Sequence, residues 1–156
     1  MSRGAVIRWM YRTGRPNRLA KALNRLTAVL GSAGIYPRLL ATLEIRGRRT
    51  GRMTSFPVAI AEYDGERYLV AMLGERSNWV ANLHAARGKA VLRHGRSEAV
   101  RLEEVDRSTT APILREYLRV APGARPHIPV DYNAPMAEFQ RIAPLYPVFR
   151  ITPDTE

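Results

Sequence analysis

The chain has 156 residues, with 25 Lys and Arg against 14 Asp and Glu, and it has no cysteine. This length and a composition that is 46% hydrophobic predict one globular domain with a substantial core, and the lack of cysteine excludes disulfides, thiolate metal sites and a cysteine nucleophile. No apolar run reaches the roughly 18–20 residues that cross a bilayer, and charge interrupts residues 1–8 before a secretory signal could form, so we expect a cytoplasmic protein.

The net charge of +11 is concentrated in the first third of the chain. Within residues 1–52, Glu44 is the single acidic side chain, whereas basic side chains recur throughout; the rest of the chain contains as many acidic as basic side chains. A nucleic-acid-binding protein that is basic over its whole surface would not show this distribution. The pattern favours two local basic features on a neutral domain.

Residues 16–31 predict a basic amphipathic helix. Four leucines at helical spacing form one stripe, and basic residues lie on the opposite side. Pro16 suits the first turn and Gly31 the end of this helix. The helix either packs by its leucines onto the domain or lies on an anionic membrane surface, which would place the protein at the inner face of the membrane. Nucleic acid is a poorer match, because no recognition motif accompanies the charge.

Strands follow the helix. Residues 39–46 alternate apolar and polar side chains, and residues 55–63 and 67–73 predict two further strands joined by a hairpin turn at Asp64-Gly65. Residues 77–87 predict a helix with Ser77 as its N-cap and Gly88 at its end.

The second half of the chain predicts one more hairpin and two helices. Strands at 89–94 and 98–105 enclose the Gly95-Arg96 turn, and helices are expected at 108–119 and 136–143 before a final strand at 148–152. Because hairpins dominate, we expect an antiparallel sheet and an α+β fold, in the form of a small barrel.

Conventional catalytic motifs are missing from the sequence. The three histidines share no ligand spacing with each other or with clustered carboxylates, so no metal site is expected. No nucleophile elbow, Walker loop or dinucleotide-binding glycine motif is present.

Two segments carry chemistry that suits an anion. Residues 46–52 place four arginines and a threonine in one turn bounded by glycines, where guanidinium groups can contact phosphate or carboxylate oxygens in pairs. Residues 74–79 form a glycine-led loop that opens a helix, whose free N–H groups also suit a phosphate. Trp79 adds a flat face on which a ring could stack. Together the two segments predict a site for a phosphate and a ring.

The run from Leu43 to Pro57, with its G-R-R-T-G-R turn, resembles the deazaflavin-dependent nitroreductase-like oxidoreductases. The similarity continues through the hairpin at 64–70, the S-N-W-V-A-N-L segment at 77–83 and the strand at 90–92, and it reappears in the closing strand at 146–151.

The resemblance implies a split β-barrel of the FMN-binding-like antiparallel type with flanking helices and an N-terminal amphipathic helix. Residues 1–35 would form the helical extension and residues 36–156 the barrel domain that binds coenzyme F-420, an 8-hydroxy-5-deazaflavin. It also implies hydride transfer from the reduced coenzyme to a small hydrophobic acceptor such as a quinone, an enone or a nitro compound. The residues expected to contact the cofactor are Arg46, Arg48, Arg49, Thr50, Gly51, Met72, Leu73, Gly74, Ser77, Asn78, Trp79 and Asn82.

Tyr132 and Tyr146 are the candidate proton donors or substrate contacts. Many members of the family that this chain resembles have a Ser-Lys pair where this chain has Met72-Leu73. We therefore expect a site that is more apolar than theirs and that favours a hydrophobic acceptor. FMN or a bound lipid is the alternative ligand, and a non-catalytic binding protein at the membrane surface is the alternative function. A homodimer is a further possibility.

Overall fold

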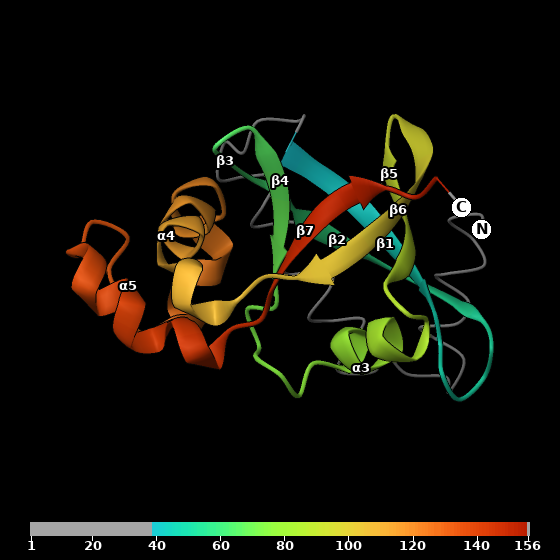
Figure 1. Cartoon of the computed structure of the whole chain (residues 1–156), viewed down its shortest axis with the longest axis horizontal. Coiled ribbons are helices and arrows are strands. Elements are labelled where there is room, and N and C mark those ends of the chain that lie inside the picture. The colour runs from blue at the N-terminus through green and yellow to red at the C-terminus, as the bar shows by residue number, and fades with distance from the viewer. Residues whose placement is uncertain (1–38, 156) are drawn as a thin grey trace.

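The computed structural model describes residues 39–155, in which seven strands form one antiparallel sheet flanked by helices (Figure 1). The strands are β1 (Leu40–Arg46), β2 (Met53–Ala59), β3 (Ala61–Tyr63), β4 (Glu66–Val70), β5 (Lys89–His94), β6 (Arg96–Glu104) and β7 (Val148–Pro153). The α-helices are α3 (Asn78–Ala85), α4 (Ala111–Val120) and α5 (Met136–Ile142). The short 3-10 helices are η2 (Arg107–Thr109), η3 (Pro122–His127) and η4 (Ala143–Leu145).

The sheet curls because its two edge strands are consecutive in the chain. The strand order is β2-β1-β5-β6-β7-β4-β3, and only Ile60 separates β2 from β3. The backbone N–H of Ile60 donates to the carbonyl of Leu39 at 2.7 Å, at the point where the chain passes from one edge to the other. These features confirm the predicted antiparallel α+β class and give the sheet the curvature of a split barrel.

Most predicted elements are present with small shifts of their ends. The strand expected over 55–63 is divided at Ile60 into β2 and β3. The hairpin at Asp64 and Gly65 has φ values of 52° and 78° at these two residues, as a two-residue turn of the primed type requires. The predicted strand at 89–94 coincides with β5, and Pro112 lies in the first turn of α4.

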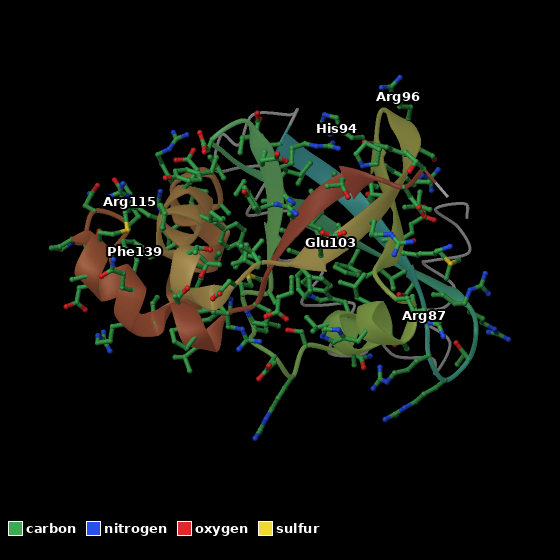
Figure 2. The ribbon with its side chains drawn as sticks, in the orientation of Figure 1. Arg87, His94, Arg96, Glu103, Arg115 and Phe139 are labelled. Atoms are coloured by element: carbon green, nitrogen blue, oxygen red, sulfur yellow. The ribbon has the colours of Figure 1, made fainter. Side chains whose placement is uncertain are left out.

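Two groups of buried side chains hold the fold. One lies inside the curled sheet and under α3, with Leu43, Leu92 and Phe149 fully buried. The other lies between α4, α5 and the β3–β4 hairpin, and it includes Phe139 of α5, labelled in Figure 2. Burial of these large apolar side chains is the main contribution to the stability of the fold. Figure 1 shows α3 at one side of the sheet and α4 with α5 at another, so the β1–β2 turn and the α4–α5 pair belong to separate regions.

The predicted amphipathic helix at 16–31, and with it the proposed extension at 1–35, lies outside the described residues. Within residues 39–155, no helix has the length and apolar character needed to cross a membrane.

Candidate functional site

The β1–β2 turn is closed by its own backbone. The N–H of Gly47 donates to the carbonyl of Arg52 at 2.7 Å, and the N–H of Gly51 donates to the carbonyl of Gly47 at 2.9 Å. Gly51 has a φ of 71°, which favours glycine. The Thr50 hydroxyl accepts from the N–H of Arg52 at 3.2 Å. The turn is therefore a compact platform for the arginines that flank it.

The four arginines of the turn have different surroundings. Arg46 Nη1 donates to the carbonyl of Gly51 at 2.9 Å and so supports the turn itself. Arg48 is hydrogen-bonded to Asn78 and Asn82 of α3. Arg49 and Arg52 are exposed, and within residues 39–155 no hydrogen bond or ion pair engages either guanidinium. These two side chains are the cations of the turn that remain available to an anion.

The loop before α3 is ordered by hydrogen bonds at Gly74. Gly74 has a φ of 86°, and its N–H donates to the carbonyl of Ala71 at 2.9 Å. Ser77 occupies the predicted N-cap position, but its hydroxyl donates to the carbonyl of Gly74 at 2.6 Å and does not cap the helix. In the described part of the chain, no acceptor engages the backbone N–H groups of Asn78 and Trp79. The first turn of α3 thus presents donors with a partial positive charge.

The structure brings the two predicted segments together through Arg48. Its Nη1 donates to Oδ1 of Asn78 at 3.0 Å and to Oδ1 of Asn82 at 2.8 Å. Its backbone N–H also donates to Oδ1 of Asn82, at 3.1 Å. The basic turn consequently lies directly beside α3.

Trp79 packs against two phenylalanines. Its ring centroid lies 5.9 Å from that of Phe56 and 5.4 Å from that of Phe149, in tilted arrangements. The indole is half-buried against the core inside the sheet, so its orientation is fixed by packing. Trp79 as a whole remains partly exposed in the first turn of α3.

Two exposed leucines lie at the loop before α3 and at the segment that contacts it. Leu73 is 65% exposed and Leu145, in η4, is 61% exposed. A Cβ atom built on Gly74 would lie 3.4 Å from the carbonyl oxygen of Leu145, which places the two segments in contact. Met72 is half-buried and packs against the cluster around α4 and α5. Leu145 was not among the sequence candidates.

The two candidate tyrosines belong to the α4–α5 region. Tyr146 is buried next to Leu145, its hydroxyl donates to the carbonyl of His127 at 3.4 Å, and burial raises its pKa. Tyr132 is half-buried, and the guanidinium of Arg125 lies 3.9 Å above its ring. Tyr146 therefore adjoins the Gly74 loop, whereas Tyr132 packs against the cluster around α4 and α5 and contacts Arg125 in η3.

Arg107 is a second residue that sequence reasoning missed. It donates to Glu104 at 2.9 Å, to the carbonyl of Pro144 at 2.8 Å and to Glu75 at 2.7 Å. It therefore ties the end of β6, the segment before Tyr146 and the loop before α3 together. No local motif marks this arginine, because its three partners come from separate parts of the chain.

The donor set at the turn and α3 suits a phosphate- and carboxylate-bearing cofactor such as coenzyme F-420. The available groups are guanidinium and backbone N–H donors. Residues 46–52 contain no acidic side chain, and Glu75, the one acidic residue of the 74–79 segment, is paired with Arg107. Among residues 39–155, no group of three His, Cys, Asp or Glu side chains could hold a metal ion.

The model of a protein family described as F420H2-dependent quinone reductase matches residues 19–123. A solved F420-H2-dependent reductase, FDR-A, is similar in structure with a TM-score of 0.51 and 18% identity over 74% of this chain and 95% of that chain. A structure described as a domain-swapped dimer has a TM-score of 0.51 and 16% identity over 86% of this chain and 96% of its own.

A protein of unknown function from Agrobacterium tumefaciens is also similar, with a TM-score of 0.54 and 14% identity over 88% of this chain and 55% of that chain. At these identities the structural similarities support the fold alone. No curated protein matches the sequence.

Proposed function

The chain belongs to the F420H2-dependent quinone reductase family, whose model covers residues 19–123, and we propose that it reduces an apolar, quinone-like acceptor where the β1–β2 turn meets α3. As a member of that family it is an oxidoreductase that depends on coenzyme F-420. The acceptor and the residues of the site are the proposed part.

One observation carries the location of the site: Arg48 is hydrogen-bonded to both Asn78 and Asn82. This contact places the backbone of the turn that carries Arg49 and Arg52 beside the first turn of α3, whose first N–H groups have no acceptor among the described residues. An anionic group placed between them would be neutralised by charge and by backbone donors together.

The bound coenzyme supplies the hydride, and the protein supplies the environment in which the hydride is transferred. Arg49, Arg52 and the first turn of α3 would hold the phosphate and carboxylate groups. Leu73 and Leu145 would exclude water from the acceptor and contact its apolar part.

Reduction of a quinone to a hydroquinone requires one proton in addition to the hydride. Tyr146 Oη is the proposed donor, because this residue follows Leu145 in the chain and a tyrosine hydroxyl carries its proton at neutral pH. Tyr132 is the second candidate. Replacing each tyrosine by phenylalanine tests these roles: loss of kcat with quinone at unchanged coenzyme affinity supports a donor, and unchanged kcat rules that tyrosine out.

The acceptor is tested by turnover of a quinone, an enone and a nitro compound with the reduced coenzyme. We expect the quinone to be reduced with the highest kcat/KM. Leu145→Ser should raise KM for an apolar quinone without changing the affinity for the coenzyme, whereas Tyr63→Ser, at an exposed hydrophobic residue on β3, should change neither. An equal effect of both variants would contradict the proposed acceptor surface.

The alternative function is a non-catalytic carrier on the same barrel. Titration with oxidised coenzyme F-420 and with FMN, monitored by quenching of tryptophan fluorescence, together with turnover assays, distinguishes the reductase from the carrier. Binding of the deazaflavin with turnover supports the reductase; tight binding without turnover of any acceptor supports the carrier, and preferential binding of FMN overturns the choice of cofactor.

Two further proposals concern assembly. Sedimentation velocity at micromolar concentration tests for a homodimer, and a single monomeric species would exclude a homodimer at that concentration. Deletion of residues 1–35 followed by co-sedimentation with anionic liposomes tests membrane contact, and unchanged sedimentation would contradict a role of residues 16–31 at the membrane.

A further inference from the structure

We propose that the two neighbouring arginines of the turn have separate roles: Arg48 positions the turn against α3, and Arg49 makes the contact with the cofactor anion. The sequence alone predicts the same role for both. The assignment of Arg49 rests on the proposed function, whereas the role of Arg48 concerns the protein without cofactor and stands independently of it.

Arg48 is engaged at both its backbone and its side chain. Oδ1 of Asn82 accepts from the backbone N–H of Arg48 at 3.1 Å and from its Nη1 at 2.8 Å, so both lone pairs of that oxygen are used. Asn82 is 5% exposed. If Arg48 moved away, this buried oxygen would lose both of its donors with little access to replacement water.

The helix makes this contact possible by its periodicity. Asn78 and Asn82 are four residues apart in α3 and so lie on one face, which lets a single guanidinium nitrogen reach both amide oxygens. The distances of 3.0 and 2.8 Å are those of well-formed hydrogen bonds. The two asparagines therefore fix both the place of the turn and the direction of the Arg48 side chain.

Arg49 has none of these contacts. It is exposed, and in the part of the chain that the structure describes no acceptor engages its guanidinium. Its charge is available to an anion without the loss of an existing hydrogen bond. Two consecutive residues thus have different roles: Arg48 positions the turn, and Arg49 binds the anion.

The variants Arg48→Gln and Arg49→Gln test this separation, because they remove the same charge from adjacent positions. Asn82→Ala removes the acceptor, and Asn82→Asp restores an oxygen at that position as a conservative control. Arg87→Gln, at the end of α3 (Figure 2), controls for the loss of one exposed positive charge near the helix.

The first readout is hydrogen exchange of the protein without cofactor. In Arg48→Gln and Asn82→Ala, the hydrogen-bonded amides of Arg48, Gly51 and Arg52 should exchange about tenfold faster than in the wild type. Arg49→Gln, Asn82→Asp and Arg87→Gln should exchange like the wild type. If Arg48→Gln also exchanges like the wild type, Arg48 does not position the turn.

The second readout is binding of oxidised coenzyme F-420 at several salt concentrations. Arg49→Gln should weaken binding and make it less dependent on salt, because a direct charge contact is lost. Arg48→Gln should weaken binding with a smaller loss of salt dependence than Arg49→Gln. Equal loss of salt dependence in the two variants would assign the anion contact to both arginines and overturn the separation.

The two readouts also distinguish the inference from the function on which part of it rests. If the wild type binds no coenzyme, the proposed function fails and the assignment of Arg49 fails with it, yet the exchange rates still decide the role of Arg48. If Asn82→Ala does not fold, the exchange rates of Arg48→Gln and Asn82→Asp still test whether Arg48 positions the turn.

Discussion

Arg107 and Glu75 form an ion pair at 2.7 Å that connects the η2 region to the loop before α3. The same guanidinium donates to Glu104 and to the carbonyl of Pro144. The hydrogen bonds to Glu104 and Glu75 raise the pKa of Arg107. One side chain therefore sets the position of the Gly74 loop relative to Leu145 and Tyr146, on which the proposed acceptor surface depends.

Arg107→Gln should destabilise the protein by about 1–2 kcal/mol, because three acceptors lose a charged donor. Glu75→Gln should cost less than about 0.5 kcal/mol, since Glu75 is 67% exposed. Urea unfolding of both variants measures the difference. Equal effects would mean that the pair with Glu75 accounts for the whole loss and that the two other contacts of Arg107 contribute nothing measurable.

Gly88→Ala should destabilise the fold by roughly 2–4 kcal/mol. Gly88 has a φ of 81°, and an added Cβ atom would lie 2.8 Å from the backbone carbonyl oxygen of Leu102. Gly95→Ala is the matched control: its φ is 77°, but nothing lies within 4 Å of the added atom, so only the backbone strain of about 1–2 kcal/mol remains. Thermal unfolding should rank the variants in that order, and a reversed order would refute the close approach at Gly88.

Ser55→Ala should stabilise the protein by about 1 kcal/mol. Among the described residues, Ser55 Oγ is buried with no hydrogen-bond partner. The neighbouring Thr54 hydroxyl donates to the carbonyl of Ile45 at 2.9 Å. Thr54→Val should therefore destabilise the protein. Chemical denaturation of the two variants checks this contrast, and a loss of stability in Ser55→Ala would show that its hydroxyl has a partner.

Alkaline pH should destabilise the fold through its buried tyrosines. Burial raises the pKa of Tyr117 and Tyr146 above the value of about 10 that applies in the unfolded chain. Their contribution is complete below that value and is lost as the pH rises towards the folded-state pKa, because the unfolded chain releases these protons first. Lysine, which titrates in the same range, occurs only at Lys21 and Lys89.

Unfolding free energies measured between pH 8 and pH 11, as an experimental range around that pKa, test this sign. We expect the decline above about pH 10 to be shallower in Tyr117→Phe than in the wild type. Tyr63→Phe, at a tyrosine that is 42% exposed, is the comparison. The same slope in Tyr117→Phe as in the wild type would contradict a role of Tyr117.

The sequence was sufficient to predict most elements because periodicity and turn residues act locally. The Asp64-Gly65 hairpin and β5 are examples, in which neighbouring residues determine the conformation. The division of the 55–63 strand at Ile60 could not be predicted in this way. It follows from closure of the sheet, where β2 pairs with β1 and β3 pairs with β4.

The sequence predicts the two segments of the candidate site but not the contacts between them. The composition of the turn and of the helix start indicates an anion site. The distinct surroundings of Arg48 and Arg49 depend on Asn78 and Asn82, thirty or more residues away. Leu145 and Arg107 join the region through tertiary contacts alone, so no pattern within a short window could identify them.

Hydrogen exchange with and without oxidised coenzyme F-420 tests the location of the cofactor most directly. Our account predicts slower exchange of the bound protein at residues 48–52 and at residues 77–80, with little change in α4 and α5. Protection confined to α4 and α5, or binding without protection of either predicted segment, would contradict it.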